Sequence, residues 1–441
     1  MDNHQLSVKS YPFYKDSEVE WLEKLPNDWE VKRLKEVLAE VVYGTSEKTK
    51  EFGKYEVLGM GDIDEGKVDY PKKRFIDNVP KELLLKKEDL LFNRTNSLAL
   101  VGKVGLIEEE LKDVTFASYL IRLRLAKKQC SKYFWYLLNS EYFINYSRSN
   151  AIQTANQANL SSSKLKQFKI LCIAINLQKS IAAYLDMKTA QCDRKIDLLT
   201  QKATQYGKLK QSLINETVNR GLDKSVAMKD SGVEWIGEVP EHWQLKRLKD
   251  IGTSIIGITY APEDALGDKT SGLLVLRSSN IQNGRLSLSD TVYVNKKVNP
   301  RQIVKKGDIL ICSRNGSRAL IGKNICIDER TEGQTFGAFM TVYRSKYFRF
   351  ISKFFNSNVF ESQSGLFGSS TINQLTVNTL NNFLLILPPL SEQKMIADYL
   401  DKKTAQIDQI IKTINTQIEK LKELRKTLIN DVVTGKIKVI E

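Results

Sequence analysis

The feature that most constrains this chain is an internal repeat, in which two stretches occur twice. Residues 16–37 (DSEVEWLEKLPNDWEVKRLKEV) and 230–251 (DSGVEWIGEVPEHWQLKRLKDI) are identical at 11 of 22 positions, and residues 178–199 and 393–414 at 13 of 22. Ordinary residue usage predicts roughly one or two matches in such a window. The partners lie 214 or 215 residues apart, so the chain consists of two copies of one unit.

Between these windows the two copies share fewer identical residues but keep the same order of motifs. VLGMGDIDEGKV (57–68) faces VLRSSNIQNGRL (275–286), and KKEDLLFNRTNSLALVGK (86–103) faces KKGDILICSRNGSRALIGK (305–323), which has one residue more. We therefore expect the ends of each unit to perform the same task twice. The middles are expected to perform different versions of one task.

The middles combine short β-branched runs with turn signals such as Asp64-Glu65-Gly66 and Asn283-Gly284. This pattern predicts strands with interspersed helices, which is an α+β (mixed α/β) fold. The candidate strands are Tyr55 to Met60, Leu273 to Leu276, Asp89 to Asn93 and Asp308 to Cys312.

A long helix is predicted at the end of each copy. The stretch from Gln393 to Asn430 has no Pro or Gly, and its apolar residues alternate four and three apart. The stripe consists of Ile407, Ile411, Ile414, Ile418, Leu421 and Leu428, with Arg425 in the remaining slot; the first copy has Cys192, Ile196, Leu199, Ala203, Tyr206, Lys210 and Leu213. Such a stripe is typical of a coiled-coil seam.

The simplest burial of two such stripes is one helix against the other, and a two-fold relation between the copies makes the pair antiparallel. Lys210 and Arg425 occupy seam slots, so they are expected to snorkel or to pair near the helix ends; a polar seam residue can fix register, but a solvated side chain is favoured. The alternative, that each helix packs on its own domain, stays open. We expect the pair to serve as a spacer through Ile196, Leu199, Tyr206, Leu213, Ile407, Ile411, Ile414, Ile418, Leu421 and Leu428.

Composition excludes several classes of protein. With 41% hydrophobic and 27% charged residues and only 9 Pro, the chain is neither disordered nor fibrous. Its apolar runs are far below the ~20 residues that span a bilayer, and residues 1–10 carry no apolar signal core. The five cysteines never form Cys-x-x-Cys, so reduced thiols and a cytoplasmic location are expected.

The net charge of +15, from 67 Lys and Arg against 52 Asp and Glu, favours a polyanionic partner. In both copies an arginine follows a predicted strand and is followed by Asn and Ser, which suit base edges and phosphates. The candidate DNA-binding residues are Arg94, Asn96, Ser97, Lys103, Arg277, Ser278, Asn280, Arg314, Asn315, Ser317, Arg318 and Lys323. An ordinary turn, in which Asn and Ser satisfy their own backbone, explains the same pattern equally well.

Other patterns carry little catalytic information. The polar stretches 153–157 and 368–371 could hold phosphates or be ordinary linkers. Only His4 and His242 exist, neither in a plausible triad or zinc site. Residues 316–324 are too long for a phosphate-binding loop and lack its Ser or Thr. We therefore expect a binding protein without metal or catalytic residues.

The tandem halves resemble the specificity subunit of Type I restriction-modification enzymes. The resemblance covers nearly the whole chain, and its most specific part is LPPLSEQKMIA at 387–397, followed by Thr404, Ile407 and Asp408. Further matching motifs are Trp29 to Leu34, Trp243 to Leu248, Gly307 to Leu310 and Gly322-Lys323. The first copy departs from the main motif, because IAINLQ stands at 173–178.

The resemblance implies target-recognition domains at 1–174 and 223–387, and conserved helices at 175–222 and 388–441. Each domain would read one half of a bipartite, asymmetric site in double-stranded DNA. The helices would form an antiparallel spacer and bind two methyltransferase (modification) subunits, which restriction-translocase subunits join. S-adenosylmethionine, ATP and magnesium would belong to those partners and not to this chain. The alternatives are a stand-alone DNA-binding scaffold and a nuclease with an unrecognised site.

Overall fold

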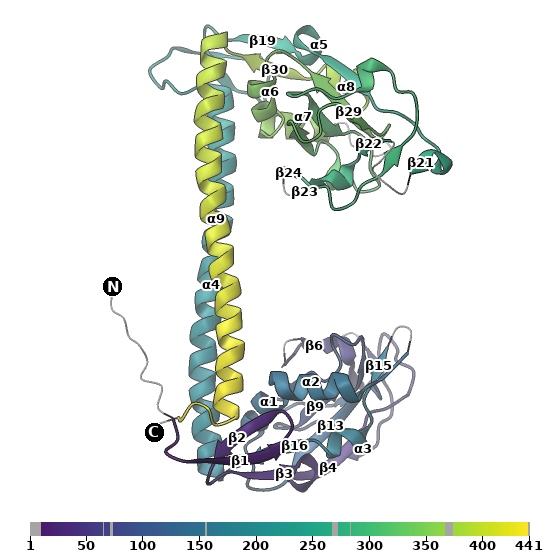
Figure 1. Ribbon diagram of the computed structural model, residues 1–441, viewed down its shortest axis with the longest axis vertical. Helices are drawn as coiled ribbons and strands as arrows, with labels where there is room; N and C mark the ends of the chain where they lie inside the picture. Colours follow the sequence, from purple (N-terminus) through teal and green to yellow (C-terminus); the bar gives the residue numbers. More distant parts are fainter. Residues whose placement is uncertain are drawn as a thin grey trace. The chain divides into compact units, whose positions relative to one another are not determined.

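The structure is a computed structural model that describes residues 10–64, 66–70, 74–154, 157–266, 272–282, 284–366 and 374–439. The chain folds as two compact units: unit 1 contains Met1–Thr200 with Thr416–Glu441, and unit 2 contains Gln201–Asn415. Two long helices, α4 (Ile175–Arg220) and α9 (Leu390–Val433), each contribute one part to each unit (Figure 1). The last residues of the chain therefore complete the unit that its first residues begin.

Each unit contains a four-stranded antiparallel main sheet with the same strand order. In unit 1 the order is β4 (Leu38–Tyr43), β13 (Leu120–Leu125), β9 (Leu90–Asn93) and β11 (Val104–Leu106). In unit 2 it is β20 (Thr253–Ile256), β29 (Met340–Arg344), β26 (Ile309–Cys312) and β27 (Asn324–Cys326). The repeat in the sequence is therefore a repeat in topology.

A second sheet is also repeated, and each copy contains one parallel strand pair. Unit 1 has β12 (Val114–Phe116), β5 (Tyr55–Leu58) and β8 (Phe75–Ile76). Unit 2 has β28 (Thr335–Phe336), β22 (Leu273–Leu276), β25 (Tyr293–Val294) and β21 (Ala265–Leu266). All four predicted strands are thus present, each ending within two residues of its expected bounds.

Shorter elements complete the two domains. Their helices are α1 (Ser131–Leu138), α2 (Glu141–Asn150) and α3 (Ser162–Lys166) in unit 1, and α5 (Leu248–Ile251), α6 (Phe348–Phe354), α7 (Asn358–Leu366) and α8 (Val377–Asn381) in unit 2. Their paired strands are β1 (Tyr14–Val19) with β2 (Leu22–Pro26), β3 (Glu30–Arg33) with β16 (Lys169–Cys172), β17 (Met228–Asp230) with β18 (Glu238–Pro240), and β19 (Gln244–Arg247) with β30 (Leu384–Leu387).

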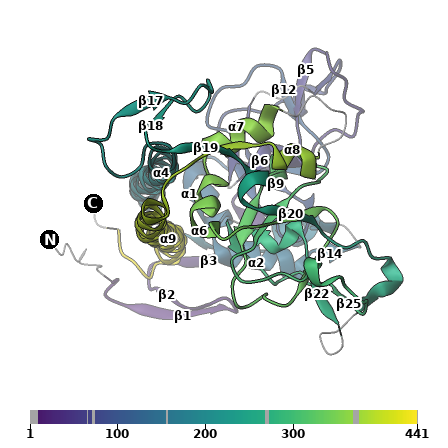
Figure 2. The same cartoon turned by 90° about the horizontal axis from the view of Figure 1, so that it is seen from above.

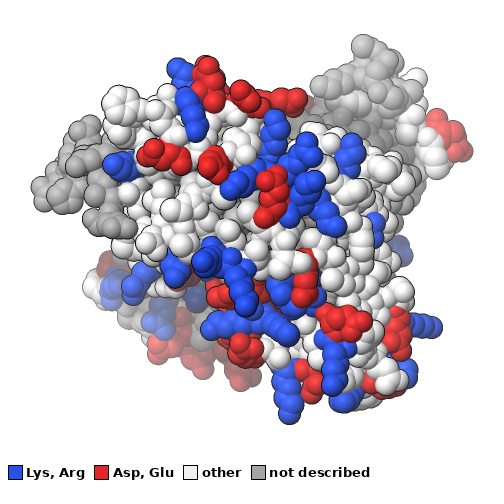
Figure 3. All heavy atoms as spheres, turned by 90° about the horizontal axis from the view of Figure 1, so that it is seen from below, with Lys and Arg blue, Asp and Glu red and all other residues white. Residues whose placement is uncertain are grey.

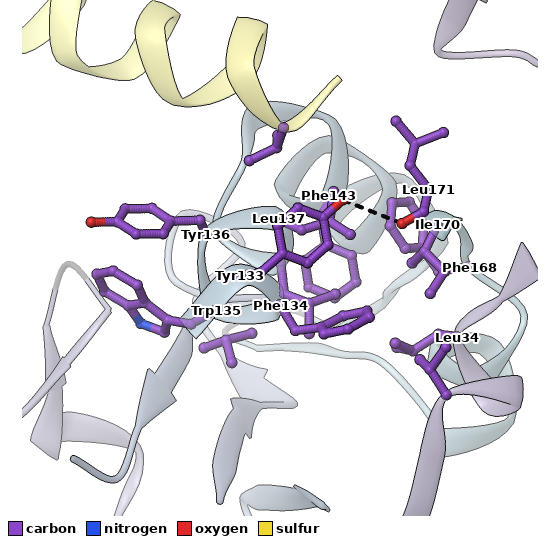
Figure 4. Close-up of a cluster of buried hydrophobic side chains, with 14 of the residues drawn as sticks. Leu34, Tyr133, Phe134, Trp135, Tyr136, Leu137, Phe143, Phe168, Ile170 and Leu171 are labelled. Atoms are coloured by element: carbon purple, nitrogen blue, oxygen red, sulfur yellow. Dashed lines mark hydrogen bonds between the residues drawn. The ribbon is translucent and has the colours of Figure 1, made fainter. Parts of the chain in front are cut away.

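In unit 1 the main sheet lies between helices and the second sheet, which explains why Leu90, Leu91 and Phe92 of its inner strand β9 are all apolar and buried. Successive side chains of a strand point to opposite faces. Leu90 and Phe92 pack with the aromatic cluster of α1 and α2, whereas Leu91 packs with Leu58 and Phe116 of the second sheet. Figure 4 shows the helix side, where the buried Tyr133 donates a hydrogen bond to the carbonyl of Leu171 over 3.3 Å.

The predicted seam is confirmed by burial. All slots from Cys192 to Leu213 and from Ile407 to Leu428 are buried or half-buried, and the residues between them in α4 and α9 are mostly exposed. Within each unit the two helices lie side by side in opposite directions (Figures 1 and 2). Val218 shares a core with Leu400 in unit 2, and Leu185 shares one with Val433 in unit 1. The antiparallel coiled coil is therefore the correct alternative.

At the two charged seam slots the structure shows pairing, not the solvated side chain that was favoured. The Lys210 Nζ lies 2.7 Å from Asp408 in unit 2, and the Arg425 Nε lies 3.0 Å from Asp193 in unit 1. Asp193 and Asp408 are equivalent in the repeat, as are Lys210 and Arg425. The same ion pair across the helices thus occurs twice. The facing carboxylate compensates each half-buried cation for the hydration that the cation loses on burial.

Each domain receives the C-terminal end of a long helix. The helix ends are followed by Gly221 and Gly435, both at φ +75°. A Cβ on Gly221 would lie 3.0 Å from the Trp243 ring, and one on Gly435 would lie 2.7 Å from Pro26. The left-handed conformation and the close approach both favour glycine here. Of the repeated tryptophans, Trp29 and Trp243 are thus core residues at the helix–domain joint, whereas Trp235 is 45% exposed.

A repeated asparagine strengthens this joint. The side-chain oxygen of Asn430 accepts a hydrogen bond from the Glu141 backbone amide at the start of α2, over 2.9 Å. The oxygen of Asn215 accepts one from the Asn358 amide at the start of α7, also over 2.9 Å. The free amides of a helix start are satisfied by a side chain of the long helix, so the domain is oriented on it within its unit.

Candidate nucleic-acid interface

The predicted DNA-binding loops begin where the central strands β9 and β26 end. Each strand is held by a buried aspartate at its start. The carboxylate of Asp89 binds Arg124 through two bonds of 2.8 and 2.9 Å, and that of Asp308 binds Arg344 through two bonds of 2.7 and 2.6 Å. Two parallel bonds fix the relative position of the strands that carry the partners. The strands that carry the loops are therefore fixed to their neighbours at the end opposite the loops.

In unit 1 the loop places Arg94 beside two exposed tyrosines. The Arg94 guanidinium lies 4.9 Å from the centre of the Tyr43 ring, and it donates to the side chain of Asn159 over 2.8 Å. The Arg94 amide donates to the carbonyl of Tyr119, whose ring is exposed. Burial alone would raise the pKa of the Tyr43 hydroxyl, but a hydrogen bond from Ser162 and the positive charges of Arg94 and Lys166 lower it.

Unit 2 repeats this arrangement with different neighbours. The Arg314 guanidinium lies 5.3 Å from the centre of the Phe339 ring, and the Arg314 amide donates to the Phe339 carbonyl over 3.0 Å. Both side chains are exposed. Phe339 and Tyr119 are equivalent in the repeat. An arginine beside an aromatic ring therefore occurs at the same strand end of both units, half-buried in unit 1 and exposed in unit 2.

The structure brings four predicted residues of unit 2 together. The side-chain amide of Asn315 donates a hydrogen bond to the Ser278 hydroxyl over 3.2 Å, and the Lys323 Nζ lies 3.4 Å from the Ser278 backbone carbonyl. Arg277, next in the chain, pairs with Asp290 at 2.7 Å. The side-chain oxygen of Asn315 also accepts a hydrogen bond from the Ser317 backbone amide. The Asn315 side chain therefore satisfies its own turn and also contacts Ser278.

Asn280 lies in the interior and not on this surface. It is fully buried, its oxygen accepts from the Arg277 amide, and its amide group donates to the carbonyls of Ser287 and Asp290. Its equivalent, the buried Asp62, accepts from the Gly59 amide in the same way. A side chain whose donors and acceptor are used by backbone holds a turn, so we remove Asn280 from the proposed DNA contacts.

The remaining predicted residues are more scattered. Ser97 is exposed, and Asn96 is half-buried with its oxygen accepting from the Ser97 amide over 2.8 Å. Lys103 is half-buried and lies 3.5 Å from Asp64. Ser317 and Arg318 are exposed beyond Asn315. Among the polar stretches, Ala155, Asn156 and 368–371 lie outside the described residues.

The aromatic component of this site was not predicted from the sequence. Tyr43, Tyr119 and Phe339 are large apolar side chains that lie on the surface beside the arginines. Arg74, which pairs with the buried Asp62, was not predicted either. The available signal was the repeat itself, because TFASY and TFGAF match in the two copies, yet aromatic residues in such a match usually belong to the core.

The surface charge is clustered and not uniform. Figure 3 shows one face of the molecule on which lysine and arginine side chains gather, with acidic side chains between the groups. Among the described residues no group of three His, Cys, Asp or Glu side chains could hold a metal ion. In the same residues no helix has the length and apolar character to cross a bilayer.

The comparisons with known proteins agree on one family. The type I restriction modification DNA specificity domain matches twice, at residues 26–205 and 240–420. The chain is 26% identical to the putative type I restriction enzyme MjaX specificity subunit of Methanocaldococcus jannaschii, over 97% of this chain and 98% of that protein. It is 32% identical to the EcoKI specificity subunit of Escherichia coli, over 46% of this chain and 44% of that protein.

Solved structures show the same fold. A chain from a structure of a type I R-M system superposes with a TM-score of 0.74 at 17% identity, covering 94% of this chain and 99% of that one. The HsdS subunit from Thermoanaerobacter tengcongensis superposes with a TM-score of 0.54 at 16% identity, covering 94% and 98%. With two matched domains that together span most of its length, the chain belongs to the type I restriction modification DNA specificity family.

Proposed function

We propose that this chain is the non-catalytic DNA-recognition subunit of a type I restriction-modification complex, in which each domain reads one half of a bipartite, asymmetric site. The observation that carries the proposal is the arginine–aromatic pair at the same strand end of both domains, with different polar neighbours in each. An identical frame with different surfaces is what two different half-sites require. We assign the domains to 1–174 and 223–387, and the helices to 175–222 and 388–441.

The proposed contacts divide by chemistry. Arg94 and Arg314 suit the acceptors of guanine, and the exposed rings beside them suit the methyl group of thymine. Asn96, Ser97, Ser278, Asn315 and Ser317 can contact base edges or phosphates. Lys103, Lys323, Arg318 and Arg277 supply charge for the phosphate backbone, which positions a protein without reading sequence.

The long helices are proposed to dock two methyltransferase subunits. The seam residues are used between the two helices, so docking needs other side chains. Leu209 and Leu424 are equivalent in the repeat, and they are 53% and 58% exposed on α4 and α9. Two exposed leucines at equivalent positions support two copies of one partner. Restriction-translocase subunits, S-adenosylmethionine, ATP and magnesium belong to the rest of the proposed complex.

The DNA proposal is tested with Arg94→Ala and Arg314→Ala in the full chain. Each change should cost about 1–3 kcal/mol of discrimination at one half-site and leave the other unchanged. The measurement is competition binding at fixed salt with duplexes altered in one half-site, after mapping methylated sites in the host genome. Arg330→Ala, an exposed arginine paired with Asp328, is the matched control. Loss at both half-sites, or at neither, would contradict the proposal.

The docking proposal is tested with Leu209→Glu and Leu424→Glu. Each single change should reduce the bound methyltransferase subunits from two to one, and the double change should remove both, as measured by native mass spectrometry. Leu198→Glu is the control, because Leu198 is equally exposed on α4 but its equivalent is Thr413. Two bound subunits in the double variant would show that the partner docks elsewhere.

A spacer role is tested by inserting one heptad into each helix. Seven residues lengthen a helix by about 10 Å, which corresponds to roughly three base pairs. The heptad keeps the seam in register, so the helices should still pair. The undefined segment between the half-sites should then lengthen, as read from the methylated sequences. An unchanged segment would show that the helices do not set the distance.

A further inference from the structure

Unit 1 contains a basic cleft of about 410 Å³ between its recognition domain and its two long helices. The charged residues of its lining are Lys103, Arg148, Lys422, Arg425 and Lys426, with a single carboxylate from Asp193. The ring of Trp135 forms part of the wall. A concave surface with such an excess of positive charge attracts a polyanion more strongly than the same charges on a flat surface.

Two lysines of this cleft, Lys422 and Lys426, are held only by weak ion pairs. Lys422 lies 3.0 Å from Glu419 and Lys426 lies 3.0 Å from Glu141, and more than half of each lysine side chain is exposed. Exposed pairs of this kind contribute about 0–1 kcal/mol, so both lysines can exchange their partners for a phosphate. The Arg148 guanidinium donates to the Ala99 carbonyl, and its buried Nε finds no acceptor among the residues that the structure describes.

Lys422 and Lys426 have uncharged equivalents in unit 2, whereas Lys103 and Arg425 correspond to Lys323 and Lys210. Lys422 corresponds to Gly207, Lys426 to Gln211, and Trp135 to Ser352. The Gln211 amide group binds the Asn356 carbonyl over 2.9 Å and so joins the helix to the domain. The frame therefore does not need cations at these places, and their presence in unit 1 requires another explanation.

The cleft adjoins the loop that carries Arg94. The Asn93 amide donates to the Lys103 carbonyl over 2.9 Å, and the Gly102 amide donates to the Asn93 carbonyl over 3.0 Å. The loop between them is closed at its base, and Arg148 holds it at Ala99. Phosphates follow one another at about 3.4 Å of axial rise along a strand. A duplex read by this loop therefore has backbone beside Lys103.

We propose that this cleft binds the phosphate backbone of DNA next to the half-site that the first domain reads. The inference rests on the proposed function, and it assigns Lys422 and Lys426 of the last helix to DNA. Phosphate contacts carry no sequence information. The cleft should therefore strengthen binding of every duplex, and only through unit 1.

The test is the salt dependence of DNA binding by the full chain with Lys422→Gln and Lys426→Gln together. Loss of two phosphate contacts should reduce the slope of log K against log salt by about 1.8, and affinity at 0.15 M salt by about 30-fold. The reduction should be the same for a target duplex and for one of random sequence. Lys420→Gln, on an exposed residue of α9 outside the cleft lining, should leave the slope unchanged.

Three results would overturn the inference. They are a wild-type slope in the double variant, an equal change in the Lys420 control, and loss of methyltransferase binding in the double variant without a change in slope. Thermal unfolding checks that the fold is intact. If the unaltered chain does not prefer its target over random DNA, the proposed function fails; a preference with an unchanged slope rejects the cleft alone.

Discussion

The two recognition domains share one buried ion pair and differ in what surrounds it. Asp308 binds Arg344 in unit 2, and Asp89 binds Arg124 in unit 1 with the same geometry. Unit 1 adds a second guanidinium, because the fully buried Arg122 stands where unit 2 has the buried Val342. The frame therefore requires one carboxylate–guanidinium pair and tolerates either a charge or an aliphatic side chain beside it.

The additional arginine is compensated within unit 1. Arg122 donates to Glu40 over 2.7 Å and to the backbone carbonyl of Glu82 over 2.5 Å. Burial lowers the pKa of Arg122, whereas the hydrogen bond to Asp89 raises that of Arg124. In unit 2, Thr253 occupies the place of Glu40 on the edge strand of the main sheet. Glu40 and Arg122 are thus present together in unit 1 and replaced together in unit 2, because an unpaired buried charge is costly.

The largest effect is expected from Asp89→Ala and Asp308→Ala. Removing one partner of a buried pair costs about 3–5 kcal/mol. Asp89→Ala should lie at the upper end, because it leaves two arginines facing Glu40, whereas Asp308→Ala leaves one arginine. Hydrogen exchange of peptides from β9 and β26 measures each unit separately. Asp64→Ala, on an exposed carboxylate, should cost below about 0.5 kcal/mol. Equal costs in the two units would show that Arg122 does not depend on Asp89.

A smaller effect is expected at the two helix–domain joints. Gly435→Ala and Gly221→Ala should each cost about 1–2 kcal/mol, since both sites need a positive φ and lie close to a neighbour. Gly435 should be the more sensitive, because its added Cβ meets Pro26 at 2.7 Å.

The control at the joints is Gly207→Ala. Gly207 lies within α4 and has nothing within 4 Å of an added Cβ. Alanine there should stabilise the helix by about 0.5–1 kcal/mol. Denaturant unfolding of the three variants separates the outcomes. A neutral Gly435→Ala would mean that the end of α9 does not require this conformation.

The smallest effect is expected from the two ion pairs across the helices. Double-mutant cycles on Lys210–Asp408 and on Arg425–Asp193 should each give about 0.5–1 kcal/mol, because the side chains are partly exposed. Exchanging the charges within one pair should recover most of the loss. Similar values in the two units would confirm a duplicated device for helix register, and a coupling of zero in both would reduce the pairs to solvated side chains.

Much of the fold could be predicted from local pattern. Ile309–Cys312 and the first three residues of Leu90–Asn93 are apolar runs, and the seam from Ile407 to Leu428 keeps heptad spacing with Arg425 in one slot. These signals depend on residues that are neighbours along one element. The loops at Arg94 and Arg314 were also identified, because the repeat aligned them after equivalent strands.

The site was predictable only in part. The role of Asn280 depends on the carbonyls of Ser287 and Asp290, which a loop brings back to it. The exposure of Tyr119 and Phe339 depends on which end of a strand is left uncovered. Neither property follows from composition or spacing, since an aromatic residue after a strand is more often buried.

The sequence by itself determined that the chain is duplicated, that each copy mixes strands and helices, and that its long helices carry seams. Only the tertiary structure decided that the last residues of the chain complete the first unit, and that Lys210 and Arg425 pair across the helices. The reason is how far apart along the chain the interacting residues lie. Periodicity and repeats are set by neighbouring residues, whereas charge pairing and burial depend on side chains that folding brings together from hundreds of residues apart.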